Sequence, residues 1–169
     1  SYISALNLDK NKVEYFLYHN YQSEVVFGIK VDYNFEKKKI TPFSYCDGQW
    51  VKKLAWKDIK DWKRPLFNLP QLLNSNQDIL VLEGEQKTVK AAKLFQDKFI
   101  CTTFQGGISN WKHTDWSSLA GRKITLWPDI DQDGGGLKNF EKLAIFLIKE
   151  HDCDARIVKL PNFDDLKKQ

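Results

Sequence analysis

The sequence predicts an α/β protein: a mostly parallel four-stranded sheet with flanking helices, preceded by a small strand-rich lobe. Residues 78–160 alternate continuous apolar runs with stretches of helical spacing, which is typical of βαβ units. Residues 13–54 instead hold short runs of β-branched and aromatic residues. Residues 64–70, with two prolines, connect the two patterns. We therefore expect a lobe over residues 1–63 and an α/β domain over residues 64–169.

The first half is expected to form four strands. Their β-branched and aromatic residues suit a half-buried pleated sheet, and they lie at 13–18, 24–33, 40–45 and 49–54. Asp47 and Gly48 separate the last two runs, and an Asp-Gly pair at such a place favours a hairpin.

The second half is expected to alternate strands and helices. Apolar runs predict strands at 78–83, 99–104, 123–127 and 155–160. Apolar residues at helical spacing predict helices at 88–95 and 137–150, and Pro70 opens a short helix at 71–74. A helical turn is expected near 116–119. Alternation of this kind leads to parallel strands.

Composition narrows the class of protein. With 169 residues, 42% hydrophobic and 28% charged, the chain can bury a core. The three cysteines have no CxxC spacing, so reduced thiols in a cytoplasmic protein are expected instead of a zinc site. No apolar run approaches the roughly 20 residues of a membrane span, and the first residues are not a signal peptide. The absence of methionine indicates a piece of a longer protein.

The net charge of +4 is unevenly distributed. Residues 1–75 carry 12 basic and 8 acidic side chains, whereas residues 76–169 carry 14 of each. Lys52, Lys53 and Lys57 lie among tryptophans in the basic part. Such lysines often form only a solvated face, but basic residues interleaved with aromatic ones also follow a phosphate backbone and stack on bases.

Acidic residues follow two of the expected strands. Glu83 ends the first strand of the α/β part, and Asp129, Asp131 and Asp133 follow the third. Ligands bind at the carboxyl ends of parallel strands, so these acids are expected to converge although 46 residues separate Glu83 from Asp129. Clustered carboxylates repel unless a hard divalent cation neutralises them, which predicts a Mg²⁺ site that could also take Mn²⁺. The alternative is that such an aspartate only caps the next helix.

Two other metal or phosphate motifs share parts of this pattern. An EF-hand loop starting at Asp129 would need a glutamate at its twelfth position, which is Phe140, and a helix in front. A Walker A loop with Lys87 as its lysine would need glycines where Val81 and Gln86 stand. Neither motif is present.

The residues around these acids resemble the TOPRIM family, the Rossmann-like catalytic fold of bacterial-type DNA primases, topoisomerases and some nucleases. A strand ending Glu83-Gly84 and a later strand ending Asp129-Ile130-Asp131 form its signature. The similarity extends to primases and primase-helicases of phages, plasmids and other mobile elements through three segments, Val81-Leu82-Glu83-Gly84-Glu85, Thr102-Thr103-Phe104-Gln105-Gly106-Gly107 and Leu126-Trp127-Pro128-Asp129-Ile130-Asp131.

The resemblance implies the catalytic core of a DNA primase that makes primers on single-stranded DNA by magnesium-dependent nucleotidyl transfer during DNA replication. Asp129 and Asp131 would hold the metal, with Asp133 as an additional ligand, and Glu83 would complete the site or act as a general base. The candidate nucleic-acid contacts are Lys52, Lys53, Lys57 and Lys87. A helicase domain or subunit is an expected partner, and a membrane is not.

The chain departs from this family pattern in two respects. Relatives often carry an acid at the position of Lys87, and a zinc-binding module that commonly precedes such primases is missing from the chain. A metal-dependent nuclease and a non-catalytic nucleic-acid-binding module are alternatives. A topoisomerase is disfavoured by the short length and because no tyrosine lies within residues 76–169.

Overall fold

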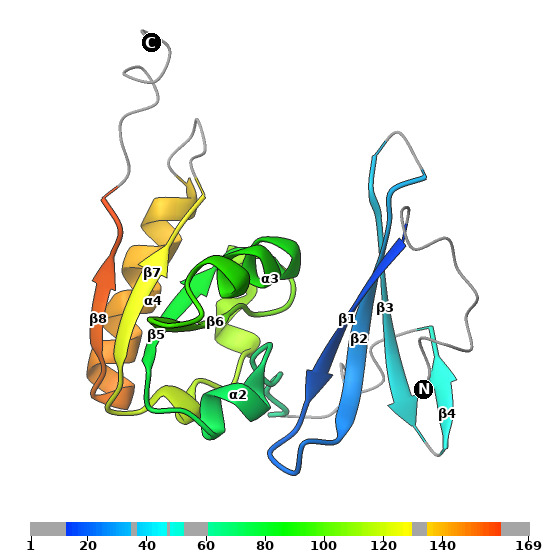
Figure 1. Ribbon diagram of the computed structural model, residues 1–169, viewed down its shortest axis with the longest axis horizontal. Helices are drawn as coiled ribbons and strands as arrows, with labels where there is room; N and C mark the ends of the chain where they lie inside the picture. Colours follow the sequence, from blue (N-terminus) through cyan, green and yellow to red (C-terminus); the bar gives the residue numbers. More distant parts are fainter. Residues whose placement is uncertain (1–12, 35–36, 47, 53–60, 130–134, 160–169) are drawn as a thin grey trace, which may run out of the picture. The chain divides into compact units, whose positions relative to one another are not determined.

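The chain forms two compact units, Ser1–Trp62 and Lys63–Gln169. The computed structural model describes residues 13–34, 37–46, 48–52, 61–129 and 135–159 (Figure 1). One unit contains an antiparallel sheet and the other a parallel sheet with helices, which confirms the predicted fold class. Within these ranges, no helix has the length and apolar character needed to cross a membrane.

The first unit is an antiparallel meander of four strands in the order β1-β2-β3-β4. The strands are β1 Val13–His19, β2 Val25–Asp32, β3 Lys39–Cys46 and β4 Gln49–Val51. Side chains alternate between the two faces of a strand, and on one face Tyr18 and Phe27 are fully buried and stack with ring centroids 4.1 Å apart. β3 and β4 form the hairpin expected around Gly48.

The second unit is a parallel sheet with strand order β6-β5-β7-β8. Its strands are β5 Asp78–Leu82, β6 Phe99–Thr102, β7 Lys123–Trp127 and β8 Asp154–Ile157. Its helices are α2 Leu69–Leu73, α3 Glu85–Leu94 and α4 Gly135–His151, with 3₁₀ helices Ile108–His113 and Ser117–Leu119. The sequence did not predict a helix over Ile108–His113, because a 3₁₀ segment lacks the 3.6-residue apolar period.

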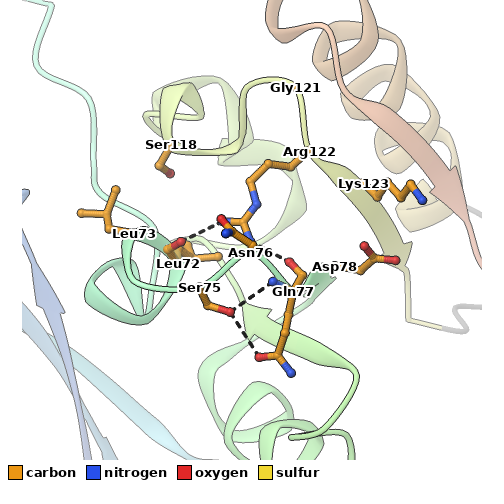
Figure 2. A pocket seen from close by; sticks show the side chains of 10 residues that line it. All are labelled: Leu72, Leu73, Ser75, Asn76, Gln77, Asp78, Ser118, Gly121, Arg122 and Lys123. Carbon is orange, nitrogen blue, oxygen red and sulfur yellow. Dashed lines mark hydrogen bonds between the residues drawn. The ribbon is translucent and has the colours of Figure 1, made fainter.

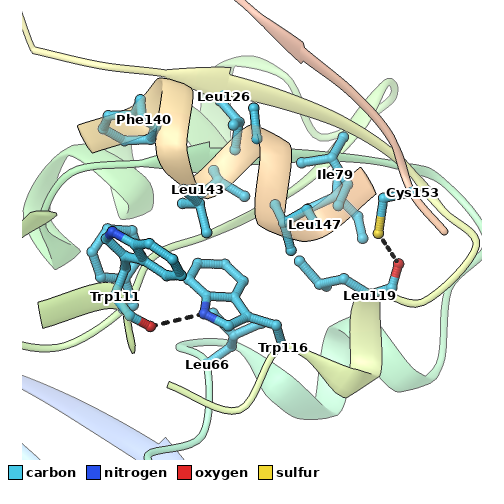
Figure 3. Close-up of a cluster of buried hydrophobic side chains, with 14 of the residues drawn as sticks. Leu66, Ile79, Trp111, Trp116, Leu119, Leu126, Phe140, Leu143, Leu147 and Cys153 are labelled. Atoms are coloured by element: carbon cyan, nitrogen blue, oxygen red, sulfur yellow. Dashed lines mark hydrogen bonds between the residues drawn. The ribbon is translucent and has the colours of Figure 1, made fainter. Parts of the chain in front are cut away.

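The core of this unit lies between the sheet and α4 (Figure 3). Phe140, Leu143 and Leu147 on α4 are completely buried, as the predicted amphipathic pattern requires. Indole Nε1 of Trp116 donates to the carbonyl of Trp111 at 2.9 Å, so the polar atom of this buried ring is satisfied.

The opposite face of the sheet is covered by α3. Leu80 and Leu82 point there, together with Ala91 of α3 and Cys101 of β6. Burial raises the pKa of the Cys101 thiol to about 11, so the thiol stays protonated at neutral pH. A sheet covered on both faces explains why the strands read as continuous apolar runs.

The connector before α2 belongs to the second unit. The amide of Phe67 donates to the carbonyl of Thr103 at 2.9 Å, and the hydroxyl of Thr102 donates to the carbonyl of Phe67 at 2.5 Å. The side-chain amide of Asn68 donates to the carbonyl of Cys101 at 3.0 Å. These bonds bind the connector along the end of β6.

Arg122 fastens the amino-terminal edge of the parallel sheet (Figure 2). Its guanidinium donates to the carbonyls of Leu72 at 2.7 Å and Gln77 at 2.6 Å. Arg122 lines a cavity of 520 Å³ at the start of β5 and β7. Because these strands begin here, the cavity lies at the amino-terminal end of the sheet, and the predicted acids lie at its carboxyl-terminal end.

Replacing Arg122 with alanine is expected to lower the free energy of unfolding by about 1–3 kcal/mol, because two backbone carbonyls lose a charged donor. Urea denaturation followed by circular dichroism measures the change. Arg156→Ala is the matched control, because Arg156 is exposed and pairs with Asp154 two residues away. Equal denaturation midpoints for the two variants would contradict the bridging role of Arg122.

Candidate functional site

Glu83 and Asp129 lie side by side at the carboxyl edge of the parallel sheet. β5 and β7 are neighbours, and their register pairs Leu82 with Trp127. Glu83 follows Leu82 directly, and the backbone N–H of Asp129 donates to Oε1 of Glu83 at 3.3 Å. Glu83 is half-buried and Asp129 is exposed. The structure therefore brings these two predicted site residues together.

Gly84 sets the direction in which the chain leaves Glu83. Its φ of 82° lies in a region that favours glycine, and α3 begins at the next residue. The Gly84 N–H donates to the hydroxyl of Thr103 at 3.1 Å, and the hydroxyl of Thr88 donates to the Gly84 carbonyl at 2.9 Å. Both threonines are fully buried. Contacts on both sides of Gly84 thus hold the turn next to Glu83.

Lys87 contacts the carboxylate of Asp129. It lies in the first turn of α3, and its ammonium group reaches both carboxylate oxygens. The two side chains are 50% and 47% exposed, so solvent and ions have access to this ion pair. The sequence had named Lys87 as a nucleic-acid contact, and the structure gives it an acidic partner within the site.

Arg64 brings a guanidinium to the loop after β6. Its Nη1 donates to the side-chain oxygen of Gln105 at 2.5 Å and to the Gln105 carbonyl at 3.2 Å. Gly106 has a φ of 96°, and a Cβ there would lie 3.1 Å from Arg64 Nη1. Sequence reasoning placed Arg64 only in a connector. The available signal was the position of Arg64, a charged residue at the boundary between the two expected domains.

The donor chemistry at the edge fits a hard divalent cation. Carboxylate oxygens are the ligands that Mg²⁺ prefers, and one or two carboxylates commonly suffice when waters and phosphates complete the shell. Glu83 and Asp129 provide such oxygens, and the Lys87 ammonium already places a positive charge on Asp129. Within the described ranges, no group of three or more acidic, histidine or cysteine side chains could hold a metal. Asp131 and Asp133 lie outside the described residues.

The lysines predicted to contact nucleic acid belong mostly to the first unit. Lys52 is exposed directly after β4, and Lys53 and Lys57 lie outside the described residues.

An aromatic row crosses one face of the antiparallel sheet. Phe43 lies over Gly28, where a Cβ would come within 2.3 Å of the ring. The Phe43 and Trp50 ring centroids are 5.0 Å apart, and those of Tyr45 and Trp50 are 5.1 Å apart. Tyr45 is 48% exposed.

A cavity of 630 Å³ lies beside the exposed end of this row. Tyr45 and Trp50 line it together with Glu24, Val25 and Val26. Sequence reasoning noted Trp50 among the lysines but missed Tyr45, which the two-residue alternation along β3 could have revealed. The exposed Tyr45 ring, next to the half-buried Trp50 and a hollow, is suited to stacking on flat ligands.

Comparisons with known proteins identify the fold. No protein-family model and no curated protein matches the sequence. Among solved structures, the primase fragment of the bacteriophage T7 primase-helicase protein matches with a TM-score of 0.59 and 19% identity, covering 90% of this chain and 55% of that one. The chain thus spans about half the length of that fragment.

A second match is a structure of the bacteriophage T7 lagging-strand DNA polymerase interacting with primase domains of two gp4 subunits, bound to an RNA/DNA hybrid and dTTP. The TM-score is 0.53 at 17% identity, over 95% of this chain and 74% of that one. Both matches extend over nearly the whole chain. The chain therefore has the fold of these T7 primase structures. It resembles the primase core of phage-type primase-helicase proteins.

Proposed function

We propose that the chain is the core of a DNA primase-like nucleotidyltransferase that makes primers on a single-stranded DNA template. The observation that carries this proposal is the pairing of Glu83 with Asp129 at the carboxyl edge of a parallel sheet. That edge is where α/β proteins bind ligands. The likeness in fold between 90% of the chain and the T7 primase fragment supports the same assignment.

In this proposal Asp129, Asp131 and Asp133 hold Mg²⁺, or Mn²⁺ in its place. Bound metal supplies neutralisation of the phosphates and of the charge that develops on the reacting oxygens. Glu83 either adds a metal ligand or accepts the proton of the attacking hydroxyl. The hydrogen bond from the Asp129 amide holds the Glu83 carboxylate in place for either role.

The first unit is proposed to bind the template. Lys52, with Lys53 and Lys57, would follow the phosphate backbone, and Tyr45 and Trp50 would stack on unpaired bases. The aromatic row and the adjoining cavity support this role, because stacking requires exposed ring surface. Residues 1–62 carry 10 basic and 8 acidic side chains, a small surplus that is in accord with a polyanionic ligand. A helicase domain or subunit is proposed as the working partner.

One observation favours the non-catalytic alternative. Lys87 already neutralises part of the acidic cluster, because its ammonium contacts both carboxylate oxygens of Asp129. A nucleic-acid-binding module without turnover would tolerate such an ion pair, so the activity test must separate binding from catalysis.

Asp129→Asn and Glu83→Gln are each expected to lower primer synthesis on single-stranded DNA with Mg²⁺ by about 100-fold or more. Each variant keeps the size of the side chain but removes the charge that binds metal or accepts a proton. Primer products from labelled nucleotides are measured on denaturing gels. Asp97→Asn is the matched control. It removes an exposed carboxylate just before β6, at the end of the same sheet where the strands begin.

The outcomes separate the candidate functions. Nicking of DNA by the wild-type chain that Asp129→Asn abolishes, without any primers, would identify a nuclease. DNA binding with neither reaction would identify a non-catalytic module.

Tyr45→Ala is expected to weaken binding to a fluorescent single-stranded oligonucleotide about fivefold or more, because base stacking contributes roughly 1–3 kcal/mol per base. Tyr45→Phe keeps the ring and should bind like wild type. Tyr21→Ala is the matched control, because Tyr21 is 46% exposed and does not line the cavity. Lys52→Ala should instead lower the slope of log affinity against log salt concentration by about one, because one phosphate contact is lost. Equal affinities of Tyr45→Ala and Tyr21→Ala would rule out stacking at this surface.

A further inference from the structure

Lys87 and Asp129 form an ion pair across the candidate site. The residues are 42 positions apart in the sequence, and the tertiary fold alone brings them together. In contrast, the ion pairs Lys30–Asp32 and Arg156–Asp154 join residues only two positions apart. The Lys87 ammonium contacts both carboxylate oxygens of Asp129. It therefore occupies the atoms that a metal ion at this carboxylate would use.

The backbone around Lys87 is held in place while its side chain can move. Gly84 lies three residues before Lys87, and its bonds with Thr103 and Thr88 fix the start of α3. The lysine side chain itself is a flexible four-carbon stem carrying a compact charge. It can leave Asp129 without any change in the helix.

The exposure of the Lys87–Asp129 ion pair determines how strongly it competes with a metal ion. Both side chains are about half exposed, so water screens their attraction. Pairs of this kind contribute little net free energy, whereas a divalent cation gains more from a carboxylate than an ammonium does. The ion pair thus reduces metal affinity without preventing binding.

We propose that Lys87 is an internal cation that competes with the divalent metal for Asp129 and thereby lowers the metal affinity of the site. The inference rests on the proposed function, since it requires Asp129 to be a metal ligand. A metal bound at Asp129 would displace the Lys87 ammonium, and α3 would keep the freed charge near the same end of the sheet. Without a metal, the same ammonium neutralises Asp129 beside Glu83.

Direct binding of Mn²⁺ to the 169-residue chain tests this competition, measured by electron paramagnetic resonance of the free ion at low ionic strength. Lys87→Gln is expected to tighten Mn²⁺ binding about two- to fivefold, which corresponds to the free energy of an exposed ion pair. Lys87→Arg keeps the cation and should retain the wild-type affinity. Asp129→Asn should lose the site.

Lys90→Gln is the matched control. Lys90 is exposed on the same helix, and its replacement removes the same charge. It should tighten Mn²⁺ binding clearly less than Lys87→Gln does. Raising the ionic strength should reduce the difference between wild type and Lys87→Gln, because salt screens the exposed pair.

The possible results separate this inference from the proposed function. If Asp129→Asn loses Mn²⁺ but Lys87→Gln and Lys90→Gln behave alike, the competition is overturned and the metal site stands. If Asp129→Asn binds Mn²⁺ as tightly as wild type, Asp129 is not a ligand, and both proposals fail. Weaker binding by Lys87→Gln than by wild type would also overturn the competition.

Discussion

The parallel pairing of β5 with β7 is the constraint on which the candidate site depends. Their register sets Leu82 beside Trp127, so the residues that follow both strands emerge at one edge. Glu83 and Asp129 meet there, and the amide of one bonds to the carboxylate of the other. A single shift of this register would separate the two acids and turn the strand side chains to the wrong faces. The packing of α4 and α3 on opposite faces of the sheet maintains this register, because each helix covers the strand side chains that alternate onto its own face.

The same end of the sheet combines a hydrogen-bonded turn with an exposed ion pair. Buried Thr103 and Thr88 hold Gly84, and through it the start of α3 and the turn beside Glu83. Lys87 and Asp129 are half exposed, so solvent and ions reach both side chains. Catalytic sites commonly need this combination, because supporting residues must fix the acids while ions and substrates enter and leave. The Asp129 amide bonds to the Glu83 carboxylate, and the Asp129 carboxylate is open to solvent, which suits the metal site proposed above.

Most elements of the α/β unit could be predicted because their signals are local. The apolar run at 78–83, the Glu-Gly that follows it and the helical spacing of Phe140, Leu143 and Leu147 each report burial directly. The 3₁₀ helix Ile108–His113 was missed because its one buried aromatic, Trp111, shows no period. The contacts of Arg64 with Gln105 were missed for a different reason. They join residues 41 positions apart, and no local pattern encodes such a pair.

The sequence by itself determined the fold class and the two acidic strand ends, because hydrophobic period and strand-end chemistry are properties of short segments. It also singled out Lys87 as a departure from the TOPRIM pattern, without a role for it in the acidic cluster. Only the tertiary structure decided which charge Lys87 meets and that Arg64 contacts Gln105. The physical reason is that such contacts form when segments distant in the sequence are packed together, and strand order and register are settled by that packing.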